Sequence, residues 1–166
     1  MKLAGVIFIL ASAWSVGCRF SSSMKMRCDR VKFFLDALQI LRNELAFLGT
    51  PLAEAYQHVA ASSQGLWGSV FLDMARRMEC DRWLAPTSAA EEALALVQGE
   101  RICGIMIDLA AKLGSYDLDA QLRGIDGAVE SAKSLLYELE AERKLRSKTY
   151  KTLSICTGAA VAILLI

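Results

Sequence analysis

The clearest pattern lies in the last third of the chain, where apolar residues recur at alternating steps of four and three. They stand at Leu118, Leu122, Ile125, Val129, Ala132, Leu136 and Leu139. Such steps place side chains on one face of an α-helix, which can then pack against other helices. The same spacing continues through Arg143, Arg146, Tyr150 and Leu153, so this face turns from apolar to basic and then to apolar again. The pattern predicts one long C-terminal helix.

Both ends of the chain carry long uncharged segments. Residues 3–18 have no charge, and neither do residues 153–166. Apolar segments beside basic residues are typical of helices that enter a membrane. We therefore predict a membrane anchor over residues 1–20 and a second membrane segment over residues 153–166. A cleaved signal peptide is the alternative for the first segment, and a buried helix of a soluble domain for the second.

The net charge of +1 hides a strong segregation along the chain. Residues 1–32 contain six bases and one acid, residues 33–142 contain eight bases and 17 acids, and residues 143–166 contain five bases and no acid. The three charges are therefore +5, −9 and +5. Because basic residues stay on the cytoplasmic side of a membrane, residues 19–152 are expected to face the cytoplasm, with lipid phosphate rather than nucleic acid beside the bases. The basic residues that flank the membrane segments are Arg19, Lys25, Arg27, Arg143, Lys144, Arg146, Lys148 and Lys151.

The middle of the chain, residues 29–150, reads as helices, because no run alternates as a strand would. Gly49 is a candidate C-terminal cap of a first helix over residues 29–48. Thr50 is then expected to cap a second helix, with Pro51 in its first turn. The expected inward faces of these two helices are Val31, Phe34, Leu35, Leu38, Leu41, Leu45 and Leu48, and Leu52, Ala55, Tyr56 and Val59.

Four more helices complete the predicted domain. The third has an inward face of Trp67, Val70, Phe71, Met74 and Met78. A loop over residues 80–87 leads to a capping box, Ser88 with Glu91, that opens a fourth helix. The fifth runs over residues 100–113 and is capped by Gly114, and Ser115 is expected to cap the sixth. The fold class is therefore all-α, a bundle of about six helices between two membrane segments.

Two glycines, Gly124 and Gly127, interrupt the long helix. A glycine inside a helix costs about 1 kcal/mol relative to alanine. Tolerance at the surface is one explanation, and the close approach of a neighbouring helix is the other. The sequence alone leaves both open.

The residues that carry catalytic chemistry are sparse. The five cysteines form no C-x-x-C pair, and His58, expected on a helix surface, is the single histidine. A disulfide framework and a Cys/His metal cluster are therefore not indicated. Gly49-Thr50-Pro51 lacks the lysine of a phosphate-binding loop. We predict a protein that is not an enzyme and needs no cofactor: a membrane scaffold, or, as the alternative, a membrane-anchored enzyme or lipid-binding sensor with an acidic helical domain.

Four short motifs carry a family resemblance by their order and by the total length of the chain. They are Leu41-Arg42-Asn43-Glu44-Leu45, Thr50-Pro51-Leu52-Ala53-Glu54-Ala55, Leu113-Gly114-Ser115-Tyr116-Asp117 and Gln121-Leu122-Arg123-Gly124-Ile125. The chain resembles the stage III sporulation protein AB family of endospore-forming bacteria. The resemblance marks six structural motif residues: Thr50, Pro51, Leu52, Glu54, Leu113 and Gly114.

Members of this family resemble the cytoplasmic domain of the F-type platform proteins of type II secretion machines. The resemblance implies a helical domain on the mother-cell side of the outer forespore membrane. It also implies partners: a secretion-type ATPase, the stage III sporulation AA protein, and other components of a channel between mother cell and forespore. A homo-oligomer is left open.

The acidic middle of the chain is the expected docking surface for a basic patch on that ATPase. Its acids gather at Glu91-Glu92, Asp117-Asp119 and Glu138-Glu140-Glu142. The first two groups stand at predicted helix starts, where the helix dipole favours negative charge. A solvated face that only keeps the domain soluble is the alternative. The candidate docking residues are Glu91, Glu92, Asp117, Asp119, Gln121 and Arg123.

Overall fold

The computed structural model describes residues 24–81, 83–97, 100–115 and 117–165, with side chains through residue 145 except that of Leu96. The chain divides into two compact units, one of Arg30–Leu136 and one of Met1–Asp29 with Tyr137–Ile166. We call Arg30–Leu136 the helical unit. The predicted anchor at residues 1–20 lies outside the described residues, and so do the side chains of the predicted segment at residues 153–166.

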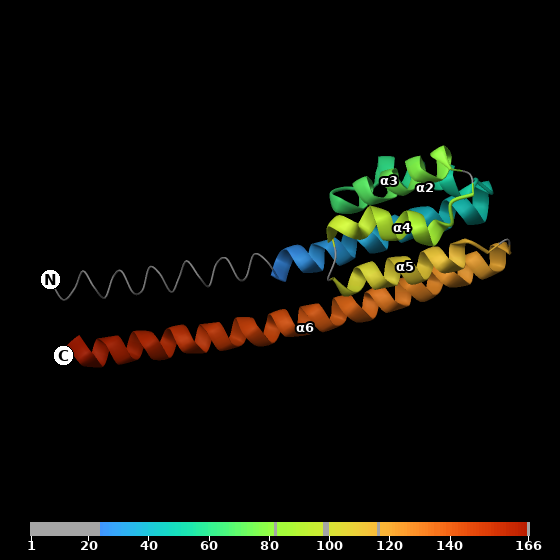
Figure 1. The fold of residues 1–166 in the computed structure, drawn as a ribbon. Helices are drawn as coiled ribbons and strands as arrows, with labels where there is room; N and C mark the ends of the chain where they lie inside the picture. Colours follow the sequence, from blue (N-terminus) through green and yellow to red (C-terminus); the bar gives the residue numbers. More distant parts are fainter. Residues whose placement is uncertain (1–23, 82, 98–99, 116, 166) are drawn as a thin grey trace. The chain divides into compact units, whose positions relative to one another are not determined.

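The regular elements of the described residues are all helices, as the sequence predicts. Residues 24–43 form an α-helix that passes directly into a π-helical turn, η1. The further elements are α2, α3, α4, a short 3-10 turn η2, α5 and α6, and Figure 1 labels the α-helices from α2 to α6. Their bounds are Glu44–Leu48 for η1, Leu52–Ser62 for α2, Leu66–Cys80 for α3, Pro86–Leu94 for α4, Ala95–Val97 for η2, Arg101–Leu113 for α5 and Leu118–Leu165 for α6. Among the described residues, no helix combines the length and the apolar character that crossing a membrane requires.

Successive helices of the helical unit pack against one another, α2 on α3, α3 on α4 and α4 on α5. The side chain of Trp67 is completely buried, and its ring centroid lies 4.4 Å from that of Phe34. The Trp67 Nε1–H donates a hydrogen bond to the carbonyl oxygen of Arg30 at 2.8 Å. Tyr56 and Phe71 form a second buried aromatic pair between α2 and α3. Most residues of the predicted inward faces therefore lie in the core, whereas Leu35, Leu52 and Met78, among others, are half-buried and Leu118 is 44% exposed.

The end of the first helix differs from its prediction. Gly49 ends the helix in the left-handed conformation, φ 62°, as expected of a C-terminal cap. Leu48, however, was assigned to the buried face and is 68% exposed. A π turn bonds residues i and i+5, so each of its residues rotates through a smaller angle about the helix axis than in an α turn. The α-helical spacing from Leu45 to Leu48 is thereby lost, and Leu48 points to solvent.

The predicted N-terminal caps of α2 and α4 are wrong. Thr50 does not cap α2, because the N-cap residue is Pro51 and no side chain bonds the free amides; the Thr50 Oγ1–H donates instead to Glu44 Oε2 at 3.2 Å. Ser88 does not open α4, which begins two residues earlier at Pro86 with no side-chain cap. Proline suits the first helical position because its missing N–H would have no partner there. The start of α4 therefore lies closer to the N-terminus than predicted.

Tyr56 offers a test of the core. Its hydroxyl is buried and has no hydrogen-bond partner in the part of the chain that the structure describes, and burial raises the pKa of this phenol. An unsatisfied buried donor costs about 1–3 kcal/mol. The Tyr56→Phe substitution should therefore raise the free energy of unfolding by about 1 kcal/mol in a urea titration followed by circular dichroism. Tyr137→Phe, at a residue that is 77% exposed, should leave it unchanged; a loss at Tyr56 would reveal a bound water there.

Candidate functional site

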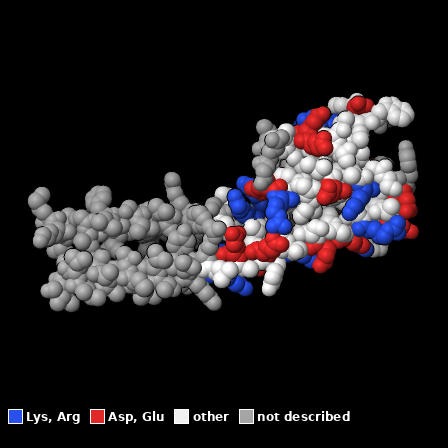
Figure 2. All heavy atoms as spheres, turned by 60° about the horizontal axis from the view of Figure 1, so that its bottom comes forward, with Lys and Arg blue, Asp and Glu red and all other residues white. Residues whose placement is uncertain are grey.

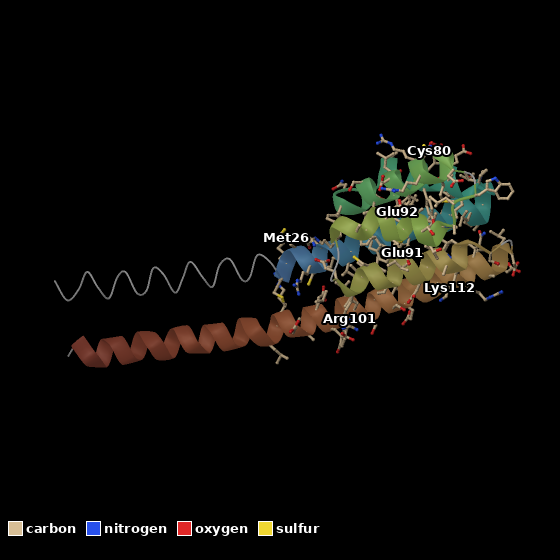
Figure 3. All side chains as sticks on the ribbon, in the orientation of Figure 1. Met26, Cys80, Glu91, Glu92, Arg101 and Lys112 are labelled. Atoms are coloured by element: carbon tan, nitrogen blue, oxygen red, sulfur yellow. The ribbon has the colours of Figure 1, made fainter. Side chains whose placement is uncertain are left out.

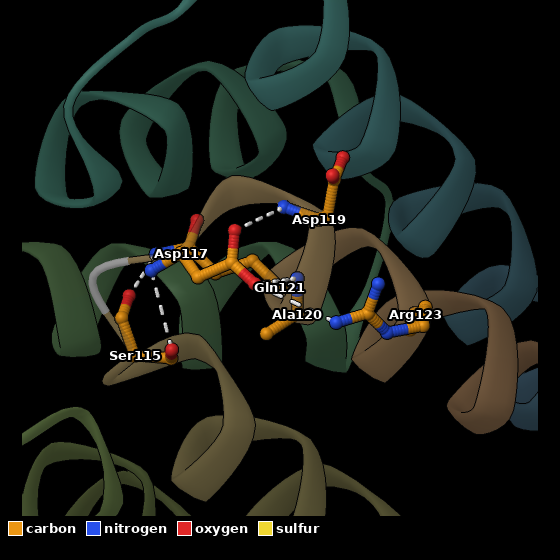
Figure 4. Close-up of polar contacts among 6 residues, drawn as sticks. All are labelled: Ser115, Asp117, Asp119, Ala120, Gln121 and Arg123. Atoms are coloured by element: carbon orange, nitrogen blue, oxygen red, sulfur yellow. Dashed lines mark hydrogen bonds and ion pairs between the residues drawn. The ribbon is translucent and has the colours of Figure 1, made fainter.

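Asp117 holds the start of α6, at the turn that leads from α5. Its Oδ1 accepts a hydrogen bond from the backbone N–H of Asp119, and its Oδ2 accepts one from the backbone N–H of Ala120, each at 3.2 Å (Figure 4). These amides are among the donors that a helix start leaves without partners. Asp117 is thus the cap that the sequence analysis assigned to Ser115. Ser115 Oγ instead accepts a hydrogen bond from the Asp117 backbone N–H at 3.3 Å.

Gln121 and Arg123 support the same turn. Gln121 Nε2 donates to the carbonyl oxygens of Leu113 at 3.2 Å and Ser115 at 2.5 Å, and so satisfies carbonyls at the end of α5. The Arg123 guanidinium lies 3.5 Å from Asp117 Oδ2, with both side chains largely exposed. The structure therefore brings Asp117, Gln121 and Arg123 together, but in a role that closes the turn between two helices.

Asp119 is exposed like Asp117, but its carboxylate takes no part in this network. Charge reversal at Asp117 would remove a helix cap, at a cost of about 1 kcal/mol, whereas reversal at Asp119 leaves the cap in place. Asp119 is thus the cleaner probe of an electrostatic docking role. That role stays a prediction for all six candidate residues.

Glu91 and Glu92 lie on α4, in a separate group (Figure 3). Both are exposed, and Glu92 forms an ion pair with Arg77 of α3, which also contacts Asp73 at 2.9 Å. Within the described residues, no hydrogen bond or ion pair joins this group to the α5–α6 turn. Glu92 therefore ties α4 to α3, whereas Glu91 makes no ion pair or hydrogen bond with the side chains that the structure describes.

Cross-helix ion pairs balance much of the acidic charge locally. Figure 2 shows acidic and basic side chains interspersed over one face of the molecule. Arg30 pairs with Glu100, and Arg42 Nε lies 2.9 Å from Asp126 Oδ1. The segregation of charge along the sequence suggested a single uniform acidic face. This view does not show one.

Glu44 forms a cluster that the sequence analysis did not predict. Its side chain is only 15% exposed, and Oε2 accepts hydrogen bonds from Thr50 Oγ1 and, at 2.9 Å, from His58 Nδ1. The cluster joins η1, the loop after it and α2. Glu44 stands in one of the family motifs and Thr50 in another, and this was the only sign of the cluster in the sequence. His58 lies on a helix surface as predicted, with 48% of its side chain exposed.

The stability of the protein should depend on the protonation of His58. The hydrogen bond to Glu44, together with the negative charges of Glu44 and Glu54, raises the imidazole pKa above its ordinary value of 6.5. The folded state thus binds the proton more tightly than the unfolded state. The stabilisation from this pair should be complete below pH 6.5 and disappear as the pH rises through the folded pKa.

The measurement is the free energy of unfolding against pH for the unaltered protein and for His58→Gln. The difference between the two should be largest at acidic pH and should fall as His58 loses its proton. Glu44→Gln should flatten the same pH dependence, because it removes the acceptor. Parallel profiles for the unaltered protein and His58→Gln would contradict a protonation-dependent contact.

The remaining predicted residues have structural positions. Leu113 is buried at the end of α5, where Gly114 terminates the helix with φ −70°, outside the left-handed region. Leu52 is half-buried and Glu54 exposed in the first turn of α2. The membrane-flanking residues whose side chains are described are exposed, and they are Lys25, Arg27, Arg143 and Lys144. Arg19 and the side chains of Arg146, Lys148 and Lys151 lie outside the described residues.

Among the described residues, no three His, Cys, Asp or Glu side chains gather as metal ligands would. An open hollow of about 480 Å³ lies between α5 and α6, lined by Arg101, Ile105, Glu130, Ser131, Ser134 and Leu135. Its lining holds one carboxylate and two hydroxyls with no histidine or cysteine. The site with the most organised polar contacts is therefore the α5–α6 turn, whose contacts stabilise the fold.

Comparison with known proteins gives one family and one fold. A family model described as stage III sporulation protein AB matches residues 2–166. A solved structure titled "Stage III sporulation protein AB (SpoIIIAB)" superposes with a TM-score of 0.62 at 19% identity, over 70% of this chain and 94% of that one. At this identity the structural likeness shows the fold alone. None of the curated proteins compared is similar enough to count as a match.

Proposed function

Because the chain belongs to the stage III sporulation protein AB family and is thus a sporulation protein, we propose that it acts as a non-catalytic membrane scaffold. In this role it couples a cytoplasmic secretion-type ATPase, the stage III sporulation AA protein, to a channel between mother cell and forespore. The observation that carries the proposal is the family match over residues 2–166. The resemblance of the family to the F-type platform proteins of type II secretion supplies the role.

The continuous helix α6 supports a mechanical role. It is a single element of 48 residues that begins at the capped α5–α6 turn and extends through the basic residues into the apolar C-terminal sequence. A helix that begins in a packed domain and continues toward a membrane segment can pass a displacement from a bound ATPase to that segment. The Asp117 cap fixes the end of α6 at which such a force would enter.

We place the protein in the outer forespore membrane, with the helical unit in the mother-cell cytoplasm. The basic blocks on either side of the acidic middle support this orientation. Cys80 is a natural probe, because it is exposed whereas Cys28 and Cys103 are buried. A membrane-impermeant maleimide should label Cys80 only after sporulating cells are permeabilised.

The control for this labelling is Cys80→Ser, which leaves Cys18 and Cys156 in place. It should abolish the signal that appears on permeabilisation. Labelling of Cys80 in intact cells would place the helical unit on the other side of the membrane and reject the orientation.

Binding to the ATPase is the direct test of the scaffold. The full chain in detergent micelles should bind the purified ATPase, and added salt should weaken the complex, since screening acts over about 8 Å at physiological ionic strength. Asp119→Lys should weaken it further if the acidic helix starts contribute, while Lys133→Glu, a reversal elsewhere on α6, should not. Lack of binding by the unaltered chain would reject the proposal, and turnover of a nucleotide or lipid by the protein alone would support a membrane-anchored enzyme.

A further inference from the structure

Three large apolar side chains of the helical unit are exposed to an unusual degree. Phe47 is 79% exposed, Leu48 is 68% exposed and Trp83 is 95% exposed. Single exposed apolar residues are common on protein surfaces, but clustered aromatic ones often mark sites of protein contact. The question is thus whether these three residues lie together.

The topology places all three at one end of the α2/α3 pair. Phe47 and Leu48 precede α2, and Trp83 follows α3. The two helices pack against each other and are joined by a turn of three residues, so the start of α2 and the end of α3 lie at the same end. A hydrogen bond from Gln57 of α2 to Glu79 of α3 agrees with this pairing. In Figure 1, η1 and the loop between α3 and α4 lie at this end.

Local contacts hold these side chains outward. The π turn η1 displaces Leu48 from the buried face, and π turns are frequent at functional sites. The turn is fixed by the left-handed Gly49 and by the bonds of Thr50 and His58 to Glu44. Such preorganisation lowers the entropy that binding a partner would cost.

The same end of the α2/α3 pair is rich in carboxylates. Glu54 in the first turn of α2, and Glu79 and Asp81 at the end of α3, are exposed there. Glu44 is largely buried against Thr50 and His58 and does not add to this rim. Arg77 in the last turn of α3 is neutralised by its ion pairs with Asp73 and Glu92. Asp81 also orders the loop, since its Oδ1 accepts a hydrogen bond from the Trp83 backbone N–H at 2.9 Å. An acidic rim would repel a second copy of this surface and an anionic membrane, and it would attract a basic protein surface.

We propose that Phe47, Leu48 and Trp83 form an anchor patch that docks into an apolar pocket with a basic rim on a partner protein. Interface hot spots are enriched in tryptophan, and the apolar core of an interface is typically enclosed by a polar rim. This docking role rests on the proposed function for the identity of the partner, the ATPase. It adds to that function the residues that make the contact and the chemistry of the surface they meet.

The test measures the affinity of the full chain in detergent micelles for the purified ATPase. Trp83→Ser should weaken binding about thirtyfold, as expected for a hot-spot residue. The double substitution Phe47→Ser with Leu48→Ser should weaken it by at least tenfold. The matched control is Tyr137→Ser, at an exposed aromatic residue outside the anchor patch, and it should bind as the unaltered chain does. Circular dichroism spectra of all variants should agree, because none of these residues is buried.

The outcomes separate this docking role from the scaffold function. Normal binding by the Trp83 and double variants would overturn the anchor patch while leaving the scaffold intact. No binding by the unaltered chain would overturn both. Trp83-dependent binding to vesicles of anionic phospholipid would show that the patch contacts lipid, and Trp83-dependent dimers in sedimentation would show that it contacts a second copy. Either result would overturn a basic protein partner.

Discussion

Replacing Trp67 with alanine should lower the free energy of unfolding by about 3–5 kcal/mol, the largest effect expected of any single substitution here. The side chain is completely buried between α3 and the first helix, and its ring lies against Phe34. Truncation removes this apolar contact and leaves a cavity. It also leaves the Arg30 carbonyl oxygen without its hydrogen bond from Nε1. Because a domain is stable by only about 5–15 kcal/mol, the variant should be largely unfolded at moderate urea concentrations.

Two further tryptophan variants make this prediction specific. Trp67→Phe keeps most of the buried area and loses the hydrogen bond, so it should cost less than Trp67→Ala. Trp83→Ala removes a side chain that is 95% exposed and should change stability by less than about 0.5 kcal/mol. Urea titrations of the three variants in the same detergent provide the comparison. Equal stabilities for Trp67→Ala and Trp83→Ala would contradict the assignment of Trp67 to the core.

The second large effect is expected where α5 and α6 approach each other. A Cβ atom added at Gly124 would lie 2.8 Å from the Cβ of Lys112, a distance that forces the helices apart. Overpacking of this kind costs about 1–3 kcal/mol. At Gly127 the nearest atom within 4 Å would be the flexible Lys112 Nζ at 3.9 Å. Gly124→Ala should therefore destabilise the protein, whereas Gly127→Ala should stabilise it by up to about 1 kcal/mol.

The opposite signs of these two substitutions are the decisive result, since both replace glycine by alanine three residues apart on one helix. Thermal unfolding followed by circular dichroism at 222 nm measures both. If both variants gained stability, helix propensity alone would decide, and the close approach at Gly124 would be unimportant. Lys112→Ala does not relieve the clash, because the Cβ atom remains, and it should leave the Gly124→Ala penalty in place.

Local patterns in the sequence were enough to predict the helices and most of the core. Amphipathic spacing is a local property, so the stripes through Phe34, Trp67 and Ile125 could be assigned to inward faces without knowledge of the fold. The order of the short motifs likewise indicated the family, which the family model confirmed. The sequence could not decide between surface tolerance and a close helix approach at Gly124 and Gly127, because both are compatible with the same local sequence.

Other features depend on residues far away in the chain or on the hydrogen-bond pattern of a single turn, and they became visible only in the folded protein. Gly124 is confined by Lys112 of another helix. Asp117 rather than Ser115 caps α6, because both residue types suit a cap and only the backbone path at the end of α5 selects between them. Leu48 fits the apolar stripe, yet a π turn anchored by Glu44 directs it to solvent. Trp83 stands in a loop, where no periodicity reports burial, so its exposure could be read only from the folded chain.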